Sequence, residues 1–419
     1  MNTNPSADQT STTPAFSSLH TDLTAALTTV ALGINPKITN PAQHGVRVQS
    51  SSNAVTLCTF DLETAVSVTL PGATPTMAGA SLLDHAQWTK VMGALVAGEA
   101  KAVAARMPVT LSGDLLTGGA MTVPIATPDP AAYIHPPLPA PTLATADSGE
   151  LLGQLLRTLS SCGTDDTLPT LTGVDFTFHG QTLTLAATDR YRFAVADVPT
   201  TLADGVTADD RPMSAVVQGA VLKRLVPVLK AHAGTISLGI STDGRWFTLT
   251  AGQITVTTRT LDGRLPRYKK LFPAEAPVSV GIPRTTLAAA LKKCAAVLKA
   301  KGDKHTPVSL LWDGEGRLTL APVLPEAQDR ARLQGIPVPH TADQGDPAVL
   351  PRRHVSFKPA YLADALAAFS GDTVTLHIPA KITTGDALAM TFTDGPAISG
   401  DGYRHLLMSV RLEDGTWNL

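Results

Sequence analysis

The chain has 419 residues, of which 43% are hydrophobic and 16% charged, with 33 Lys and Arg against 35 Asp and Glu. This length predicts two to four domains, and the composition excludes a disordered chain. No apolar run approaches the ~20 residues that a membrane-spanning helix needs. Three widely spaced cysteines, Cys58, Cys162 and Cys294, exclude a disulfide framework and favour a reducing cytoplasm.

In chain order, we expect a polar, disordered tail at 1–15 and then one order of elements three times: helix, β-hairpin, helix, further strands. Apolar residues at i, i+4 spacing predict helices at 18–32, 81–96, 147–161, 218–232, 283–301 and 358–369. Alternating apolar residues around a short turn predict hairpins at 45–57, 173–185 and 308–320. Strand-rich stretches close the repeats at 104–125, 234–260 and 373–412.

Proline-dense segments at 135–142 and 273–278 predict linkers between the repeats. We therefore predict three α+β domains, with a surface insertion in the third and a short tail after it. The predicted domains are residues 16–138, 143–273 and 276–412, the insertion is 324–353 and the tail is 413–419.

The predicted helices carry eleven basic residues against five acidic ones, a balance of +6 that leaves −8 for the rest of the chain. If the helices share one face, that face is positive, and a phosphate backbone is its natural partner. The alternative is that these cations merely occupy the solvated sides of amphipathic helices. The candidate DNA-facing residues are Lys90, Arg157, Lys223, Arg224, Lys230, Lys292, Lys293, Lys299 and Lys301.

Several motifs in order, at domain spacing, resemble the bacterial DNA polymerase III β subunit, the sliding clamp, over about residues 16–412. The resemblance is strongest at GVDF (173–176) and LTLAATDRYRF (183–193). It continues in FDLE (60–63), LDGRLPRYKKLFP (261–273) and HLLMSVRL (405–412).

The resemblance implies a head-to-tail homodimeric ring of six domains, with helices lining a channel for duplex DNA and sheets outside. It implies a cytoplasmic, nucleoid-associated processivity factor that is loaded by a clamp-loader complex. Its partners would be the DNA polymerase III catalytic subunit and other proteins with clamp-binding motifs. No catalytic activity, cofactor, metal or membrane contact is expected.

The resemblance also places a peptide-binding pocket between the second and third domains. Three residues depart from the family pattern: Arg190 replaces a small residue, Lys358 an asparagine and Ser409 a proline. The implied pocket residues are Leu171, Thr188, Arg190, Tyr191, Arg192, Phe193, Pro266, Lys270, Leu271, Lys358, Tyr361, Pro396, Leu406, Leu407, Met408, Ser409, Val410, Arg411 and Leu412. We further expect Trp417 or Leu419 of the tail to fold back toward this pocket.

Two other interpretations remain open. The polar run from Thr188 to Arg192 suggests an enzyme, but the chain lacks the common nucleophile, phosphate-loop and metal-ligand motifs, and Asp189 is better explained as a turn residue. The second is a divergent clamp paralogue that binds clients or clamp-directed inhibitors through an altered pocket and has weak DNA function. The small basic content of the first domain favours this second interpretation.

Overall fold

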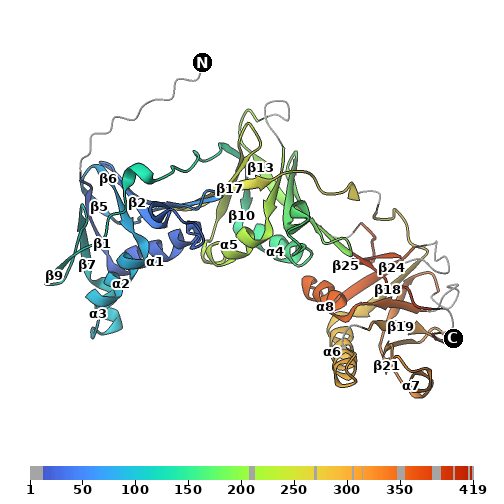
Figure 1. The fold of residues 1–419 in the computed structure, drawn as a ribbon. Coiled ribbons are helices and arrows are strands. Elements are labelled where there is room, and N and C mark those ends of the chain that lie inside the picture. The colour runs from blue at the N-terminus through green and yellow to red at the C-terminus, as the bar shows by residue number, and fades with distance from the viewer. Residues whose placement is uncertain are drawn as a thin grey trace. The chain divides into compact units, whose positions relative to one another are not determined.

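The computed structural model describes residues 13–206, 213–268, 271–303, 306–313, 315–346, 354–379, 388–399, 402–413 and 416–417. The chain separates into two compact units, and Figure 1 shows its helices and strands. The first consists of Met1–Ser148, Leu202–Met213 and Arg224–Thr260, and the second of Gly149–Thr201, Ser214–Lys223 and Leu261–Leu419. Within the described ranges, no helix has both the length and the apolarity that crossing a bilayer requires.

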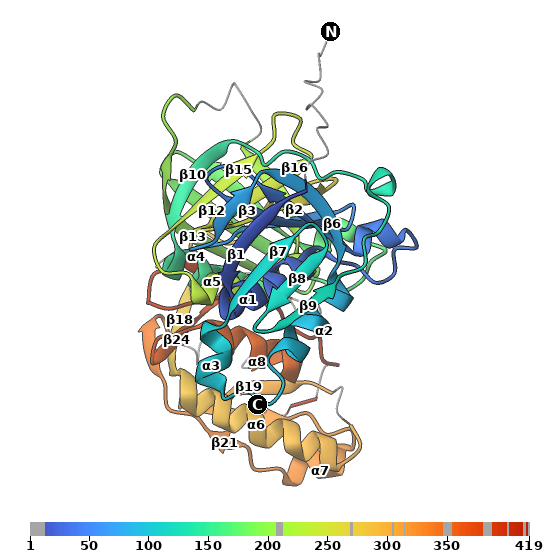
Figure 2. The same cartoon turned by 90° about the vertical axis from the view of Figure 1, so that its left-hand side faces the viewer.

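The first unit holds two antiparallel sheets. One has the strand order β5-β1-β7-β8-β9, and Figure 2 looks onto its strands β1, β7, β8 and β9. Pairing in the other runs β6-β2-β3-β4-β17-β16-β15-β10. The strands are β1 (Ala15–Leu19), β2 (Gly45–Ser50), β3 (Val55–Phe60), β4 (Thr64–Thr69), β5 (Thr74–Met77), β6 (Gly79–Asp84), β7 (Pro108–Ser112), β8 (Leu115–Gly118), β9 (Met121–Pro124), β10 (Thr142–Asp147), β15 (Thr235–Ile240), β16 (Trp246–Ala251) and β17 (Ile254–Leu261).

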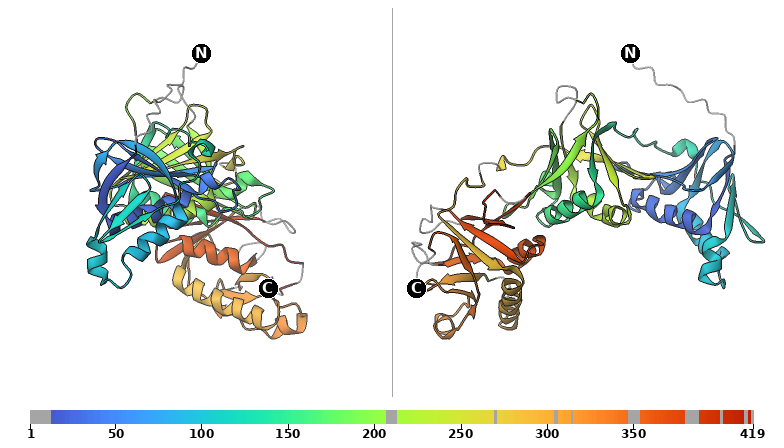
Figure 3. Two further views of the ribbon diagram at one scale, coloured as in Figure 1. Left: turned by 60° about the vertical axis from the view of Figure 1, so that its left-hand side comes forward. Right: turned by 180° about the vertical axis from the view of Figure 1, so that it is seen from behind.

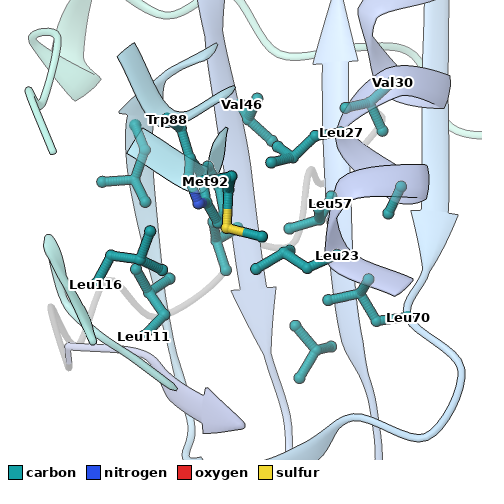
Figure 4. Close-up of a cluster of buried hydrophobic side chains, with 14 of the residues drawn as sticks. Leu23, Leu27, Val30, Val46, Leu57, Leu70, Trp88, Met92, Leu111 and Leu116 are labelled. Carbon is teal, nitrogen blue, oxygen red and sulfur yellow. The ribbon is translucent and has the colours of Figure 1, made fainter. Parts of the chain in front are cut away.

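Helices α1 and α2 of this unit pack on the sheets through apolar residues. Leu23, Leu27 and Val30 lie one turn apart on α1 and are fully buried against strand residues such as Val46 and Leu57 (Figure 4). Each strand contributes every second residue to this core because its side chains alternate between the two faces of the sheet. The helices are α1 (His20–Val30), α2 (His85–Leu95) and α3 (Lys101–Arg106), and the 3₁₀ turns are Ala31–Gly33, Pro41–His44 and Pro130–Ala132.

The second unit also holds two antiparallel sheets. Pairing in the larger runs β14-β11-β12-β13-β26-β25-β24-β18-β22, and the smaller has the order β21-β20-β19-β23. The strands are β11 (Gly173–His179), β12 (Thr182–Thr188), β13 (Arg192–Leu202), β14 (Ser214–Gln218), β18 (Val278–Pro283), β19 (Val308–Trp312), β20 (Leu318–Pro322), β21 (Ile336–Pro337), β22 (Thr341–Gln344), β23 (His354–Phe357), β24 (Thr373–Ile378), β25 (Ala389–Thr393) and β26 (Tyr403–Met408).

Two long helices of the second unit, α6 and α8, contact each other and are the gold and orange helices on the left of the rear view (Figure 3, right). Helices α4 and α5 have residues in both units. The bounds are α4 (Ser148–Leu159), α5 (Gly219–Ala231), α6 (Arg284–Ala300), α7 (Ala327–Arg332), α8 (Pro359–Ala368) and the 3₁₀ turn Pro169–Thr172.

Sheets continue across two of the predicted repeat boundaries. In the first unit, β4 pairs with β17, matching Thr64 to Thr258 and Val68 to Ile254. In the second, β13 pairs with β26, matching Arg192 to Leu407. Pairing of this kind removes two exposed sheet edges, which would otherwise be open to unwanted strand addition.

The α+β fold class is confirmed, and all six predicted helices and three predicted hairpins are present. Helix α5 continues through Pro227, whose side chain is exposed. Three features differ from the sequence prediction or were missed by it: β1 already begins at Ala15, α3 was not expected, and the described part of the 324–353 insertion forms α7, β21 and β22. The division into three domains remains a prediction.

Candidate functional site

The turn after β12 is built around one carboxylate. Oδ1 of Asp189 accepts hydrogen bonds from the backbone N–H groups of Tyr191 and Arg192, both at 3.0 Å. The intervening residue, Arg190, has a φ of 81°. This left-handed conformation costs an L-residue about 1–2 kcal/mol because its Cβ approaches the backbone. Asp189 is therefore a structural turn residue, as the sequence analysis expected.

The first repeat contains the same turn. Oδ1 of Asp61 accepts from the N–H groups of Glu63 and Thr64, at 3.1 and 2.6 Å, and Leu62 between them has a φ of 72°. Among the described residues, Leu62 and Arg190 are the non-glycine residues with positive φ. The repeat inferred from sequence thus extends to individual hydrogen bonds.

The guanidinium of Arg192 is held by two carboxylates. Its Nε donates to Asp189 at 2.9 Å and its Nη1 to Asp364 of α8 at 2.6 Å. The side chain is 10% exposed, and its Cζ lies 4.7 Å from the ring centre of Tyr361. Burial opposes the charged form, but the hydrogen bonds that Arg192 donates to Asp364 and Asp189, together with the charges of these carboxylates, outweigh it and raise the pKa of Arg192. Arg192 thereby ties the turn to α8.

Two tyrosines and two further cations lie beside this ion-pair network. The rings of Tyr191 and Tyr361 stack with centroids 5.9 Å apart and an interplanar angle of 30°. Nζ of Lys358 lies 4.8 Å from the first ring and 5.4 Å from the second. Cζ of Arg190 lies 6.0 Å from the Tyr191 ring. Cations at such distances are attracted to the negative face of an aromatic ring.

A cavity of about 280 Å³ opens between this turn, α8 and the loop that follows α4. Among the predicted pocket residues, Leu171, Arg190, Tyr191, Arg192 and Tyr361 line it. The other lining residues were not predicted from the sequence, although the polar run before Pro169 marks them as a loop leading to Leu171. They are Cys162, Gly163, Thr164, Asp165, Leu168 and Asp189.

Burial raises the pKa of the Cys162 thiol to about 12. The thiolate is the nucleophilic form of cysteine, so this side chain is an inert part of the wall. The wall loop is closed by a hydrogen bond from the N–H of Gly163 to the carbonyl of Leu171, at 2.7 Å.

An apolar cluster adjoins the turn on the strand side. Phe193 and Leu406 are buried in it, with Leu171 and Met408 packed against it at partial exposure. The N–H of Met408 donates to the carbonyl of Tyr191 at 2.8 Å, which fastens the end of β26 to the turn. Four predicted pocket residues therefore meet in one cluster, whose other members are Ala186, Val195, Leu265, Tyr268, Phe272 and Ala389.

The remaining predicted pocket residues have various positions. Thr188 supports the turn by donating its hydroxyl to the carbonyl of Arg192 at 2.6 Å. Leu407 is fully buried, so it is a core residue. Lys270 lies outside the described residues. The others do not line the cavity and are Pro266, Leu271, Pro396, Ser409, Val410, Arg411 and Leu412.

For Trp417, the structure does not meet the expectation that the tail folds back toward the pocket. Trp417 donates its indole N–H to the hydroxyl of Ser309 on β19 at 3.0 Å, and neither residue lines the cavity. Upstream, the N–H of Val410 donates to the carbonyl of Ser356 on the neighbouring β23 at 2.7 Å. The tail therefore follows the smaller sheet. Leu419 lies outside the described residues.

One candidate DNA-facing residue is corrected by the structure. Arg157 forms an ion pair with Asp394, donates to the carbonyl of Ala368 at 2.7 Å, and has its Cζ 4.0 Å from the ring centre of Tyr403. Its side chain is 15% exposed, so it is a structural cation. The other candidates are exposed: Lys90, Lys223, Arg224, Lys230, Lys292, Lys293, Lys299 and Lys301.

Two of those exposed cations have partners. Lys301 forms an exposed ion pair with Asp329 of α7, and Arg224 donates to the carbonyl of Leu32. Exposed pairs of this kind contribute little stability, so the charge of Lys301 remains open to competition from other anions.

Comparisons with known proteins agree with this architecture. A family model described as the central domain of the DNA polymerase III β subunit matches residues 148–267. The β sliding clamp of Streptomyces coelicolor is 28% identical over 384 residues, which cover 89% of this chain and 92% of that protein.

Solved structures extend the likeness to nearly the whole chain. The sliding clamp of Bacillus subtilis covers 96% of this chain and 100% of its own with a TM-score of 0.76 at 18% identity. The DNA polymerase III β subunit of Thermotoga maritima has the same coverage, a TM-score of 0.73 and 20% identity. The solved structures show that this chain shares their fold, and the family model and the Streptomyces relative show sequence similarity to DNA polymerase III β subunits, the β sliding clamps.

Proposed function

We propose that this chain is a DNA sliding clamp, a processivity factor that encircles duplex DNA and tethers DNA polymerase III and other DNA-processing proteins. The observation that carries the proposal is a joint that the chain forms twice, β4 with β17 and β13 with β26. A head-to-tail contact that repeats generates a ring when its rotation closes. A third such joint between two copies would complete a homodimeric ring of six domains.

The exposed cations suit this role better than sequence recognition. Lys292, Lys293 and Lys299 lie at exposed positions of α6, and Lys223 and Lys230 at exposed positions of α5. Contacts with phosphates attract DNA of any sequence, whereas contacts with base edges would hold a clamp at preferred sites. A sliding ring requires the first kind and must avoid the second.

The cavity and its neighbouring apolar cluster suit short client peptides. The cluster presents Leu171 and Met408 at partial exposure. The cavity beside it is lined by apolar and aromatic residues, Leu168, Leu171, Tyr191 and Tyr361, together with the charged residues Asp165, Asp189, Arg190 and Arg192. Apolar recesses with a few polar groups at the rim are the usual form of a peptide site. The clamp would act as a cytoplasmic accessory subunit, placed on DNA by a clamp loader, with no catalytic step of its own.

A topological assay tests this proposal. The protein is loaded by a bacterial clamp loader and ATP onto nicked circular plasmid, isolated by gel filtration, and challenged with a restriction enzyme that cuts the plasmid once. A clamp stays with the circle and leaves from the ends of the linear form. Retention on linear DNA would indicate ordinary binding. Failure to stay on the circle would favour a clamp-like protein that binds clients without encircling DNA.

A further inference from the structure

Two cations beside the cavity, Arg190 in its lining and Lys358 next to the tyrosines, have no carboxylate within ion-pair distance among the described residues. Within the described part of the chain, Arg190 and Lys358 form no ion pair, although both flank the ring of Tyr191. The neighbouring Arg192 differs, because Asp189 and Asp364 already neutralise it. Both charges are exposed and lie beside aromatic faces, and the charge of Arg190 also interacts with Asp165 of the cavity wall.

Each of these cations also occupies a backbone position that does not favour it. Arg190 has the left-handed φ of 81°, where glycine is preferred. Lys358 is the N-cap residue of α8 and makes no capping hydrogen bond. Caps are normally Ser, Thr, Asp or Asn, and a positive charge there opposes the helix dipole. Arg190 and Lys358 thus both depart from the residue types that their backbone positions favour, and both place a cation beside the same pair of tyrosines. Such departures are characteristic of a functional site.

We propose that Arg190 and Lys358 select client peptides that carry a carboxylate beside their apolar anchor. The anchor occupies the cavity between Leu168, Leu171 and Tyr361, and the carboxylate lies at its mouth between the two cations. Charge-assisted hydrogen bonds to the carboxylate replace the weaker contacts with the tyrosine rings. This inference rests on the proposed peptide-binding function.

The test uses the full-length protein and fluorescein-labelled pentapeptides with Leu and Phe anchors. An Asp is scanned through the three other positions, and each Asp peptide is compared with its Asn counterpart. All carry an amidated C-terminus, and one further Asn peptide has a free C-terminus, so that side-chain and terminal carboxylates are distinguished. Fluorescence anisotropy gives the Kd for wild type, Arg190→Gly, Lys358→Ser and the double variant. Lys292→Ser, at an exposed site on α6, is the matched control.

In at least one position the wild type and the control should bind the acidic peptide about tenfold more tightly than its amide counterpart, because the carboxylate gains charge-assisted contacts. The preference should shrink with added salt and should fall to less than twofold in the double variant. If tighter binding is seen only for the Asn peptide with a free C-terminus, compared with its amidated form, the recognised group is a terminal carboxylate.

Two results would overturn the inference: equal affinity of the wild type for all acidic and amide peptides, or a preference that survives in the double variant. If no peptide of the set binds the wild type at all, the peptide-binding function itself is wrong at this site. That outcome is distinct from binding without charge preference.

Discussion

Arg157 on α4 forms an ion pair with Asp394, which follows β25 and lies 237 residues further along the chain. The pair is nearly enclosed, with side chains 15% and 18% exposed, and Tyr403 covers the guanidinium. Removing one partner of a buried pair leaves the other charge uncompensated. The contact joins α4 to the C-terminal strands of the same unit.

We expect Arg157→Ala to lower the free energy of unfolding by about 2–3 kcal/mol, somewhat less than for a fully buried pair because both side chains keep some water contact. Urea unfolding followed by circular dichroism measures this. Lys293→Ala, at an exposed position of α6, is the control and should change stability by less than about 0.5 kcal/mol. Equal stability of Arg157→Ala and wild type would contradict the structural role.

The left-handed backbone conformation of Arg190 leads to a prediction for glycine at this position. Arg190→Gly should raise the free energy of unfolding by about 0.5–1 kcal/mol, because relief of backbone strain exceeds the added entropy of the unfolded chain. Leu62→Gly, in the equivalent turn of the first repeat, should behave in the same way. Arg190→Ala keeps the strain and should bring no increase. A destabilised glycine variant at both turns would show that the φ values do not reflect strain.

The tail contact is also testable. Trp417→Phe keeps the aromatic ring but removes the indole N–H that donates to Ser309, so stability should fall by about 0.5–1.5 kcal/mol. Because neither residue lines the cavity, the Kd for client peptides should change less than twofold. Thermal unfolding and peptide anisotropy measure the two effects. A several-fold change in Kd would support the original expectation that the tail reaches the pocket.

Two buried histidines predict an acid-sensitive fold. Burial lowers the pKa of His377 to about 4 and that of His405 to about 3. His377 lies between the hydroxyls of Ser279 and Thr393, at 2.8 and 2.7 Å. Both histidines are neutral in either state above pH ~6.5, but below it the unfolded chain binds more protons. The stability that the two neutral histidines contribute should therefore be complete above that pH and should fall as the pH decreases toward 4.

His377→Gln retains hydrogen-bonding capacity without titrating. Between pH 6.5 and 5, the slope of its unfolding free energy against pH should be smaller than the wild-type slope by about 1 kcal/mol per pH unit. Guanidinium unfolding at several pH values gives both slopes. Parallel slopes would mean that His377 is protonated in the folded protein.

The sequence alone predicted most local structure correctly. The i, i+4 spacing of leucines in α1 and the alternation of residues in β11 and β12 depend only on residues close in sequence. Helices and hairpins could therefore be located from these patterns. Asp189 was identified as a turn residue because its side chain bonds only two and three positions ahead. Within this site, Leu171, Tyr191 and Tyr361 came from the resemblance to the clamp family.

Only the tertiary structure decided the contacts between distant segments. The register of β4 on β17 and the pairing of β13 with β26 depend on strands from different repeats, which no local pattern specifies. From its place in the sequence, Arg157 resembles a solvent-facing cation on an amphipathic helix. Its buried role could not be predicted because Asp394, which neutralises it, is distant in sequence. The same reason explains why the cavity wall from Cys162 to Leu168 was missed: its role exists only where α8 and the turn at Arg190 fold against it.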